Sequence, residues 1–161
     1  MVRRTPVVVE RHRSGPARVS QRRYEVIPLD VDGVLHDMND HGMAVGQEIG
    51  AGGAMRAVRV TTSGTADLGT LGGSTAAARG TNDAGAIVGG SLTEGDEAHH
   101  AFLYEAGAMH DLNELVAPEL ECELIQALAI NNRGDILAIG HYDGADRVLL
   151  LTPGDGDRDP S

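Results

Sequence analysis

One segment of this chain occurs three times, and this repetition limits the possible folds more than any other feature. The middle copy reads Asp-Leu-Gly-Thr-Leu-Gly-Gly-Ser at residues 67–74, followed by Asn-Asp-Ala-Gly at residues 82–85. Weaker copies lie on both sides, and the turn residues Asn39, Asn82 and Asn131 are 43 and 49 residues apart. Because a single repeat of this size cannot bury its apolar face alone, the three copies must stack on one another.

The middle copy predicts four short antiparallel strands. We expect them at residues 74–81, 86–92, 99–105 and 109–115, with a tight turn at residues 82–85 between the first two. Asn, Asp and Gly tolerate the backbone conformations that such a turn needs. Four short strands in one repeat of this length are typical of a propeller blade. The sequence therefore predicts an all-β, propeller-like fold.

The chain divides into three repeats between two polar ends. We expect a basic flexible arm at residues 1–23, repeats at residues 24–64, 65–108 and 109–154, and a polar tail at residues 155–161. Seven of the thirteen arginines lie in the arm, which is read as a solvated leader rather than a nucleic-acid tail. The remaining body is strongly acidic, which argues against nucleic acid or an anionic membrane as a partner.

Three blades are too few to close a propeller ring, which typically has about four to eight. The predicted solution is a homodimer in which two chains complete a six-bladed ring, because two-fold dimers are the commonest oligomers. A prism or trefoil-like closure within one chain is the alternative. The only helical expectation is a turn near residues 118–128, opened by Pro118.

Composition excludes several classes of protein. The only cysteine is Cys122, so neither an intramolecular disulfide nor a cysteine-based zinc site is expected. No stretch approaches the roughly 20 apolar residues of a membrane span. The valines at residues 7–9 are too few for a signal-peptide core. We therefore expect a cytoplasmic protein with no metal and no cofactor.

The middle repeat resembles the HAF repeat, a family of short β-rich repeats named for a His-Ala-Phe motif, which stands here at residues 100–102. The other repeats carry Arg-Ala-Val at residues 56–58 and Arg-Val-Leu at residues 147–149. The resemblance covers residues 24–154 and implies a β-rich, propeller-like fold. The family is common in secreted bacterial proteins with many repeats and has no single known activity. This chain departs from it in having three repeats and no export signal.

Histidine is the first side chain to consider for acid–base chemistry, because it changes charge near neutral pH. His36 is expected on the innermost strand of the first blade, where Arg79 and Leu128 hold the same place in the other repeats. The loops that open on the mouth of the ring contribute further candidates, and the predicted catalytic set is His36, Arg79, His99, His141 and Tyr142. In this set a His or Tyr would move a proton and Arg79 would hold an anionic enolate or carboxylate.

Three more residues are predicted to bind a ligand beside this set: Tyr104, Glu48 and Asp30, the acids also orienting the catalytic groups. His100 belongs to the repeat motif, so we expect it to have a packing role. His41 and His110 are expected on the face opposite the mouth. No two histidines have a spacing typical of a zinc site on a helix.

Two functions fit these observations. The first is a small cofactor-free lyase, cyclase or isomerase that acts on a bulky metabolite. The Ala, Gly and Arg usage suggests a bacterial source, where such proteins often serve biosynthesis in secondary metabolism. The second function is a non-catalytic propeller scaffold that binds a ligand or a protein at the same mouth. Fold alone does not choose between them.

Overall fold

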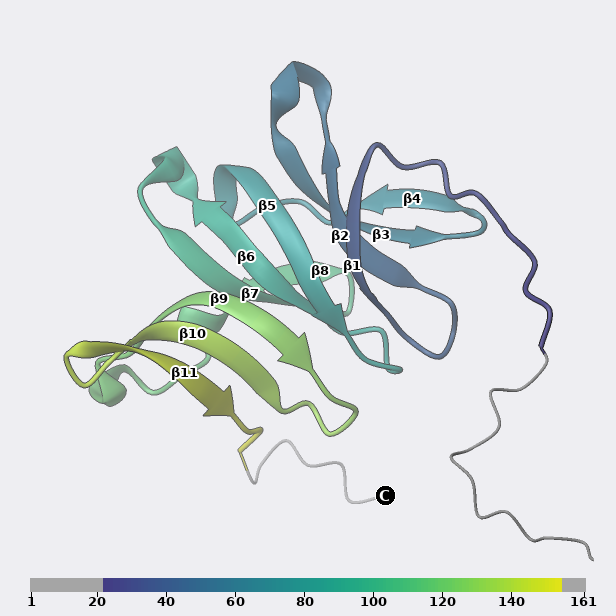
Figure 1. The fold of residues 1–161 in the computed structure, drawn as a ribbon. Coiled ribbons are helices and arrows are strands. Elements are labelled where there is room, and N and C mark those ends of the chain that lie inside the picture. Colours follow the sequence, from purple (N-terminus) through teal and green to yellow (C-terminus); the bar gives the residue numbers. More distant parts are fainter. Residues whose placement is uncertain (1–21, 155–161) are drawn as a thin grey trace, which may run out of the picture.

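The protein is an all-β chain built from three antiparallel sheets, as a computed structural model describes for residues 22–154 (Figure 1). The expected tail at residues 155–161 and nearly all of the expected arm lie outside the described residues. The short helices of the described part are all 3-10 helices, none of them long and apolar enough to cross a membrane.

Each sheet takes its strands from consecutive segments of the chain. Sheet 1 has the spatial order β1 (Gly33–Met38), β2 (Ala44–Ile49), β3 (Met55–Thr61) and β4 (Gly64–Asp67). Sheet 2 has the order β5 (Gly72–Thr81), β6 (Ile87–Thr93), β7 (His99–Glu105) and β8 (Ala108–Asp111). Sheet 3 has the order β9 (Glu123–Ile130), β10 (Ile136–Tyr142) and β11 (Ala145–Leu151). The 3-10 helices are η1 (Ala51–Gly53), η2 (Glu94–Asp96), η3 (Leu112–Glu114) and η4 (Pro118–Leu120).

The predicted repeat of four antiparallel strands is confirmed for sheets 1 and 2 and is wrong for sheet 3, which has three strands in the described part of the chain. The fourth strand of sheet 2 is also shorter than expected. It ends at Asp111 because the Asp111 carboxylate caps η3 by accepting a hydrogen bond from the Asn113 amide. The helical turn expected near residues 118–128 is confined to η4, and β9 follows from Glu123.

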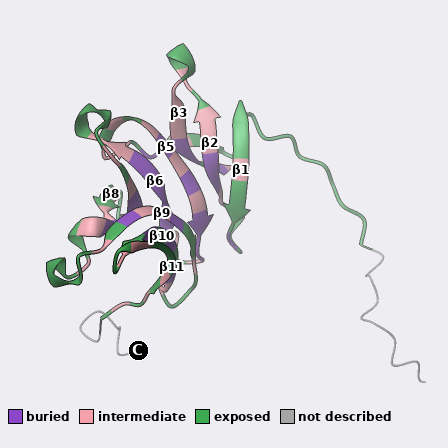
Figure 2. Cartoon of the chain, turned by 60° about the vertical axis from the view of Figure 1, so that its left-hand side comes forward, coloured by how far each residue is buried: buried purple, intermediate pink, exposed green. Residues whose placement is uncertain are grey.

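Sheet 2 lies between the other two sheets (Figure 1). Its face toward sheet 1 holds an apolar cluster formed by Val45, Ala57, Leu68, Ala76, Ala78, Ile87 and Phe102. Its face toward sheet 3 holds a second cluster formed by Val88, Ala101, Leu112, Leu124, Ala127, Ile136 and Ala138. Small side chains dominate both clusters, so the sheets approach closely, and the buried residues concentrate on β5 and β6 (Figure 2).

The repeated asparagines form a hydrogen-bonded ladder between the sheets. Asn39 Nδ2 donates to the carbonyl oxygen of Asn82 at 3.1 Å, and Asn82 Nδ2 donates to that of Asn131 at 3.0 Å. The amide oxygen of each also accepts backbone N–H groups of its own turn. The ladder stops at Asn131, whose Nδ2 donates to Asp135 Oδ2 instead. The repeat asparagine therefore fixes both its own turn and the position of the next sheet.

The three sheets form an open row with an apolar face left uncovered at one end (Figure 1). Sheet 3 exposes four large apolar side chains outward, with exposed fractions of 36% to 69%: Leu137, Ile139, Val148 and Leu150. Neither a closed ring nor the alternative closure within one chain is present in the described residues. The coarse prediction of repeated antiparallel sheets is confirmed, and the ring stays a prediction.

Candidate functional site

The same irregularity occurs in the first strand of every sheet. The register of β1 with β2 skips His36, that of β5 with β6 skips Arg79, and that of β9 with β10 skips Leu128. Each of these residues is therefore the extra residue of a β-bulge. Bulges re-aim side chains and recur next to active sites. The position that the sequence singled out is thus structurally special in all three repeats.

The bulges bring His36 and Arg79 together between sheets 1 and 2. Arg79 Nη1 lies 3.1 Å from His36 Nε2. A guanidinium can only donate hydrogen bonds, so Nε2 must be the acceptor. This contact therefore holds His36 as a neutral imidazole with its proton on Nδ1. The structure thus brings these two predicted residues into contact, and their role in a catalytic site stays a prediction.

The surroundings favour the neutral form of His36. Desolvation lowers the pKa of His36 most, and the positive charge of Arg79 lowers it further. A side-chain hydrogen bond with Gln47 acts in the opposite direction. The His36 side chain nevertheless stays exposed to solvent. At neutral pH the site therefore offers a solvent-exposed, unprotonated imidazole whose Nε2 is engaged by the guanidinium of Arg79.

Arg79 itself is only partly satisfied. Its single hydrogen bond within the described residues is the one from Nη1 to His36. Its Nε is buried and has no hydrogen-bond partner in the same part of the chain. A buried N–H without a partner is costly and calls for an explanation such as a missing ligand or water. Arg79 thus retains donors with which it can hold an anion.

His99 connects sheets 2 and 3. It begins β7, and its Nδ1 lies 2.9 Å from the carbonyl oxygen of Ile125 on β9. Gly90 makes room for its ring, because a Cβ there would collide with the imidazole. These contacts give His99 a structural role, and no hydrogen bond joins it to His36 or Arg79 in the described residues.

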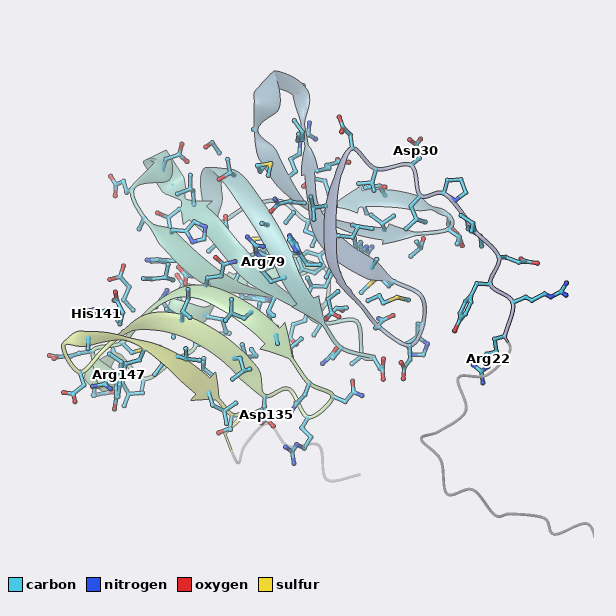
Figure 3. All side chains as sticks on the ribbon, in the orientation of Figure 1. Arg22, Asp30, Arg79, Asp135, His141 and Arg147 are labelled. Carbon is cyan, nitrogen blue, oxygen red and sulfur yellow. The ribbon has the colours of Figure 1, made fainter. Side chains whose placement is uncertain are left out.

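His141 and Tyr142 lie at the end of β10, far from the His36–Arg79 pair. They line a surface pocket of about 410 Å³ together with Leu120, Glu121, Asp143 and Gly144. His141 Nδ1 lies 3.2 Å from Asp146 Oδ1 across the β-hairpin. Figure 3 shows Arg79 near the middle of the molecule and His141 at the outer end of sheet 3. One chain therefore does not join His141 and Tyr142 to His36 in a single site.

The three predicted ligand-binding residues are also dispersed. Tyr104 packs against the apolar cluster between sheets 1 and 2. Glu48 lies on β2 opposite Arg56 of β3. Asp30 precedes β1, where its carbonyl oxygen accepts a hydrogen bond from Thr65, and it lies on the opposite side of the molecule from His141 (Figure 3).

Two residues that support the site were not predicted from the sequence. Gln47 bonds His36, and Asp37 Oδ2 accepts the backbone N–H of Thr81 at 2.9 Å, which ties β1 to β5 next to the bulges. Gln47 directly follows Gly46, the repeated glycine of the second strand, so its position in the repeat could be predicted from the sequence. Its contact with His36 could not be predicted, because the bulge that turns His36 toward Gln47 depends on strand register.

No protein-family model matches this chain, and no curated protein or solved structure shows significant similarity to it. The resemblance to HAF repeats therefore stays a prediction. Within residues 22–154, no three His, Cys, Asp or Glu side chains lie close enough together to hold a metal ion.

Proposed function

We propose that the His36–Arg79 pair binds a small anionic metabolite and that His36 moves a proton on it. The observation that carries this proposal is the 3.1 Å contact of a neutral imidazole with a guanidinium that keeps unused donors, at a recurrent bulge. Arg79 would hold a carboxylate or an enolate oxygen. Once the ligand replaces His36 as the hydrogen-bond acceptor of Arg79 Nη1, His36 would take a proton from the carbon next to the ligand's carbonyl group. Many eliminations, isomerisations and cyclisations of carbonyl compounds begin with this step.

The site would be completed by a second copy of the chain. The outward face of sheet 3 matches faces that are buried elsewhere in the repeat. Strand pairing places Leu137 and Val148 where sheet 1 has Val45 and Ala57, and both of the latter are fully buried against sheet 2. Burying apolar side chains is worth about 1.5–3 kcal/mol each. Sheet 1 of a second copy would cover this face, and two copies would close a ring of six sheets with the two His36–Arg79 pairs lining its centre.

The same ring would bring the β10–β11 end of sheet 3 to the mouth, so His141 and Tyr142 remain proposed as contributors to the binding of a bulky ligand. His99, which begins β7 of sheet 2 beside the corresponding loop, remains proposed with them. Glu48, Tyr104 and Asp30 have weaker support, because Tyr104 already packs in the core and Asp30 lies outside β1.

The second candidate function is binding without catalysis. It is favoured by the contact itself, because Nε2 of His36 already accepts a hydrogen bond from Arg79 and is not free to act as a base until a ligand displaces it. A scaffold that captures a carboxylate would need Arg79 and would not need proton transfer by His36.

One experiment separates the two functions. Full-length protein is mixed in heavy water with a panel of 3-oxo carboxylates from acetoacetate to larger aromatic analogues. Binding is followed by the NMR shifts of the histidine rings. Exchange is followed as deuterium incorporation at the acidic carbon of the ligand in excess of the incorporation measured without protein. The acid–base enzyme predicts binding that Arg79→Gln abolishes and exchange that His36→Gln abolishes while binding persists.

His110→Gln is the matched control, because His110 lies on β8 and has no side-chain hydrogen bond in the described residues. Binding without any exchange would support the scaffold. If no carboxylate of the panel moves the His36 resonance, or if Arg79→Gln binds as well as the unaltered protein, the proposed anion site is wrong.

A further inference from the structure

Within residues 22–154, the outer edge of sheet 3 is unpaired. In sheets 1 and 2 a fourth strand, β4 or β8, pairs with the third strand, whereas β11 pairs only with β10. The register of the second and third strands shows which residues correspond. Ala44 is opposite Val60, Ile87 is opposite Tyr104, and Ile136 is opposite Leu151. Leu151 therefore holds the place in β11 that Val60 holds in β3.

The sequence of a fourth strand stands at the other end of the chain. The fourth strands of sheets 1 and 2 end in Asp-Leu, at residues 67–68 and 111–112. The same pattern recurs as Asp-Val at residues 30–31, directly before β1. The residues ahead of it form no strand, and Val26 and Ile27 are 93% and 62% exposed. This segment has the composition of a strand and lacks a partner in the described residues.

A recurring contact between a basic side chain and a carboxylate points to the missing contact. In sheet 1, Arg56 Nη1 lies 3.3 Å from Asp67 Oδ2, and in sheet 2 His100 Nδ1 lies 2.7 Å from Asp111 Oδ2. Arg147 is the corresponding basic residue of sheet 3. It stands four residues before Leu151 in β11, just as His100 stands four residues before Tyr104 in β7. In the described residues Arg147 has no carboxylate partner, and its Nε donates to the carbonyl oxygen of Tyr142.

The carboxylate that corresponds to the partner of Arg147 is Asp30. Figure 3 shows these two residues at opposite ends of the molecule, with sheet 2 between them. They cannot meet within one chain in this arrangement. They can meet between two chains stacked so that sheet 1 of one copy follows sheet 3 of the other.

We infer that residues 26–31 of one copy pair with the free edge of β11 in a second copy and supply its missing fourth strand. The inference rests on the proposed ring and specifies the contact that closes it. The pairing is antiparallel and follows the register of β3 with β4, in which Val60 is opposite Thr65. Leu151 would then lie opposite Pro28, Leu150 opposite Leu29, and Leu149 opposite Asp30, which brings the Asp30 carboxylate to Arg147.

Pro28 fits this register. In sheet 1 the N–H of Leu68 donates to the carbonyl oxygen of Ala57 at 2.9 Å, so Ala57 and Leu68 form a hydrogen-bonded pair. Hydrogen-bonded and non-hydrogen-bonded pairs alternate along an antiparallel ladder. Thr65, three residues before Leu68, is therefore in a non-hydrogen-bonded pair, and its N–H faces away from β3. Pro28 would occupy this place, where the missing N–H of proline costs no ladder bond.

The first test is a charge exchange in the full-length protein. Asp30→Arg and Arg147→Asp are each expected to raise the dissociation constant of the dimer, measured by light scattering over a dilution series, by about 5- to 100-fold. The double variant should return within a few-fold of the unaltered protein, because the pair is restored with reversed signs. Glu105→Arg in sheet 2 and Arg59→Asp, on the face of sheet 1 toward sheet 2, make the same charge changes outside the proposed contact and should leave the dissociation constant unchanged.

The second test fixes the register by disulfide formation in a Cys122→Ser background. Leu29→Cys in one chain is mixed with Leu150→Cys in another, and the mixture is oxidised. Residues of a hydrogen-bonded antiparallel pair have Cα atoms about 5.5 Å apart, which is within the range of a disulfide. Val148→Cys is the control, since the diagonal neighbour lies about 7–8 Å away, at or beyond that range. We expect a mixed disulfide with Leu150→Cys and little with Val148→Cys.

The outcomes separate this inference from the proposed site. A dimer with no mixed disulfide and no response to Asp30→Arg overturns the strand exchange and leaves the ring standing. In a third protein that carries both Leu29→Cys and Leu150→Cys, a disulfide formed within one monomeric chain overturns both the exchange and the ring. A larger head-to-tail assembly with the mixed disulfide supports the exchange and overturns the ring of two copies. The anion-binding experiment on His36 and Arg79 is independent of all three outcomes.

Discussion

Replacing Asn82 by alanine tests the asparagine ladder that joins the sheets. The change removes the hydrogen bond from Asn82 Nδ2 to the carbonyl oxygen of Asn131 and the one that Asn82 Oδ1 accepts from the Ala86 amide. Asn82 is 7% exposed, so water does not readily replace either bond. A hydrogen bond contributes about 0.5–1.5 kcal/mol net, and a buried group left without a partner costs about 1–3 kcal/mol. We expect Asn82→Ala to lower the free energy of unfolding by about 2–4 kcal/mol.

The matched control is Asn131→Ala. Asn131 is exposed, and its amide bonds only groups of its own turn, including the Arg133 and Asp135 amides. Water can take over these bonds, so the expected loss is about 1 kcal/mol. The assay is urea denaturation followed by circular dichroism, with all proteins at one concentration. If Asn82→Ala and Asn131→Ala lose the same free energy, the ladder contributes nothing between the sheets and the reasoning is wrong.

Three further predictions follow from single residues. Phe102→Ala should lower the free energy of unfolding by about 3–5 kcal/mol in the same assay, because this only phenylalanine is fully buried between sheets 1 and 2. A loss below about 1 kcal/mol would contradict that packing. The pKa of His36 is lower in the folded chain than in the unfolded chain, so the unfolded chain binds this proton first as the pH falls. The free energy of unfolding should therefore decrease as the pH falls through 6.5 toward the pKa of His36 in the folded chain. Arg79→Gln should raise the pKa of His36, measured by NMR titration, and should make the free energy of unfolding change less with pH. An unchanged titration would mean that the guanidinium does not act on His36. Burial raises the pKa of the Cys122 thiol, so it should react with a thiol reagent at pH 8 more slowly than in urea, and equal rates would place it at the open surface.

Three bulges show how far the sequence predicts the site. Repeat equivalence placed His36, Arg79 and Leu128 at one position of the first strands, because the same turn asparagine follows each of them. It did not predict that each is the extra residue of a bulge, since a bulge is a relation between two strands and depends on the register of the partner. It also did not predict that only the first two would touch.

The predicted set of five catalytic residues illustrates the limit of alignment along the repeat. In the sequence, His99, His141 and Tyr142 flank the loops between the second and third strands of their repeats. In the structure, His99 forms a hydrogen bond with the backbone of β9, whereas His141 and Tyr142 line a separate pocket. A common position in a repeat gives a common end of the sheet. The distance between those positions depends on the angle between neighbouring sheets, which the sequence does not state.

The amino-acid sequence by itself determined that this chain is a set of repeated antiparallel sheets, because turn residues and apolar alternation act within a few residues of one another. Tertiary structure alone decided that His36 accepts a hydrogen bond from Arg79. It also decided that, in the part of the chain from residue 22 to residue 154, sheet 3 has three strands and leaves an apolar face and a free strand edge at one end of the row. These features arise from contacts between segments far apart in the chain, and such contacts depend on how the sheets stack as whole bodies.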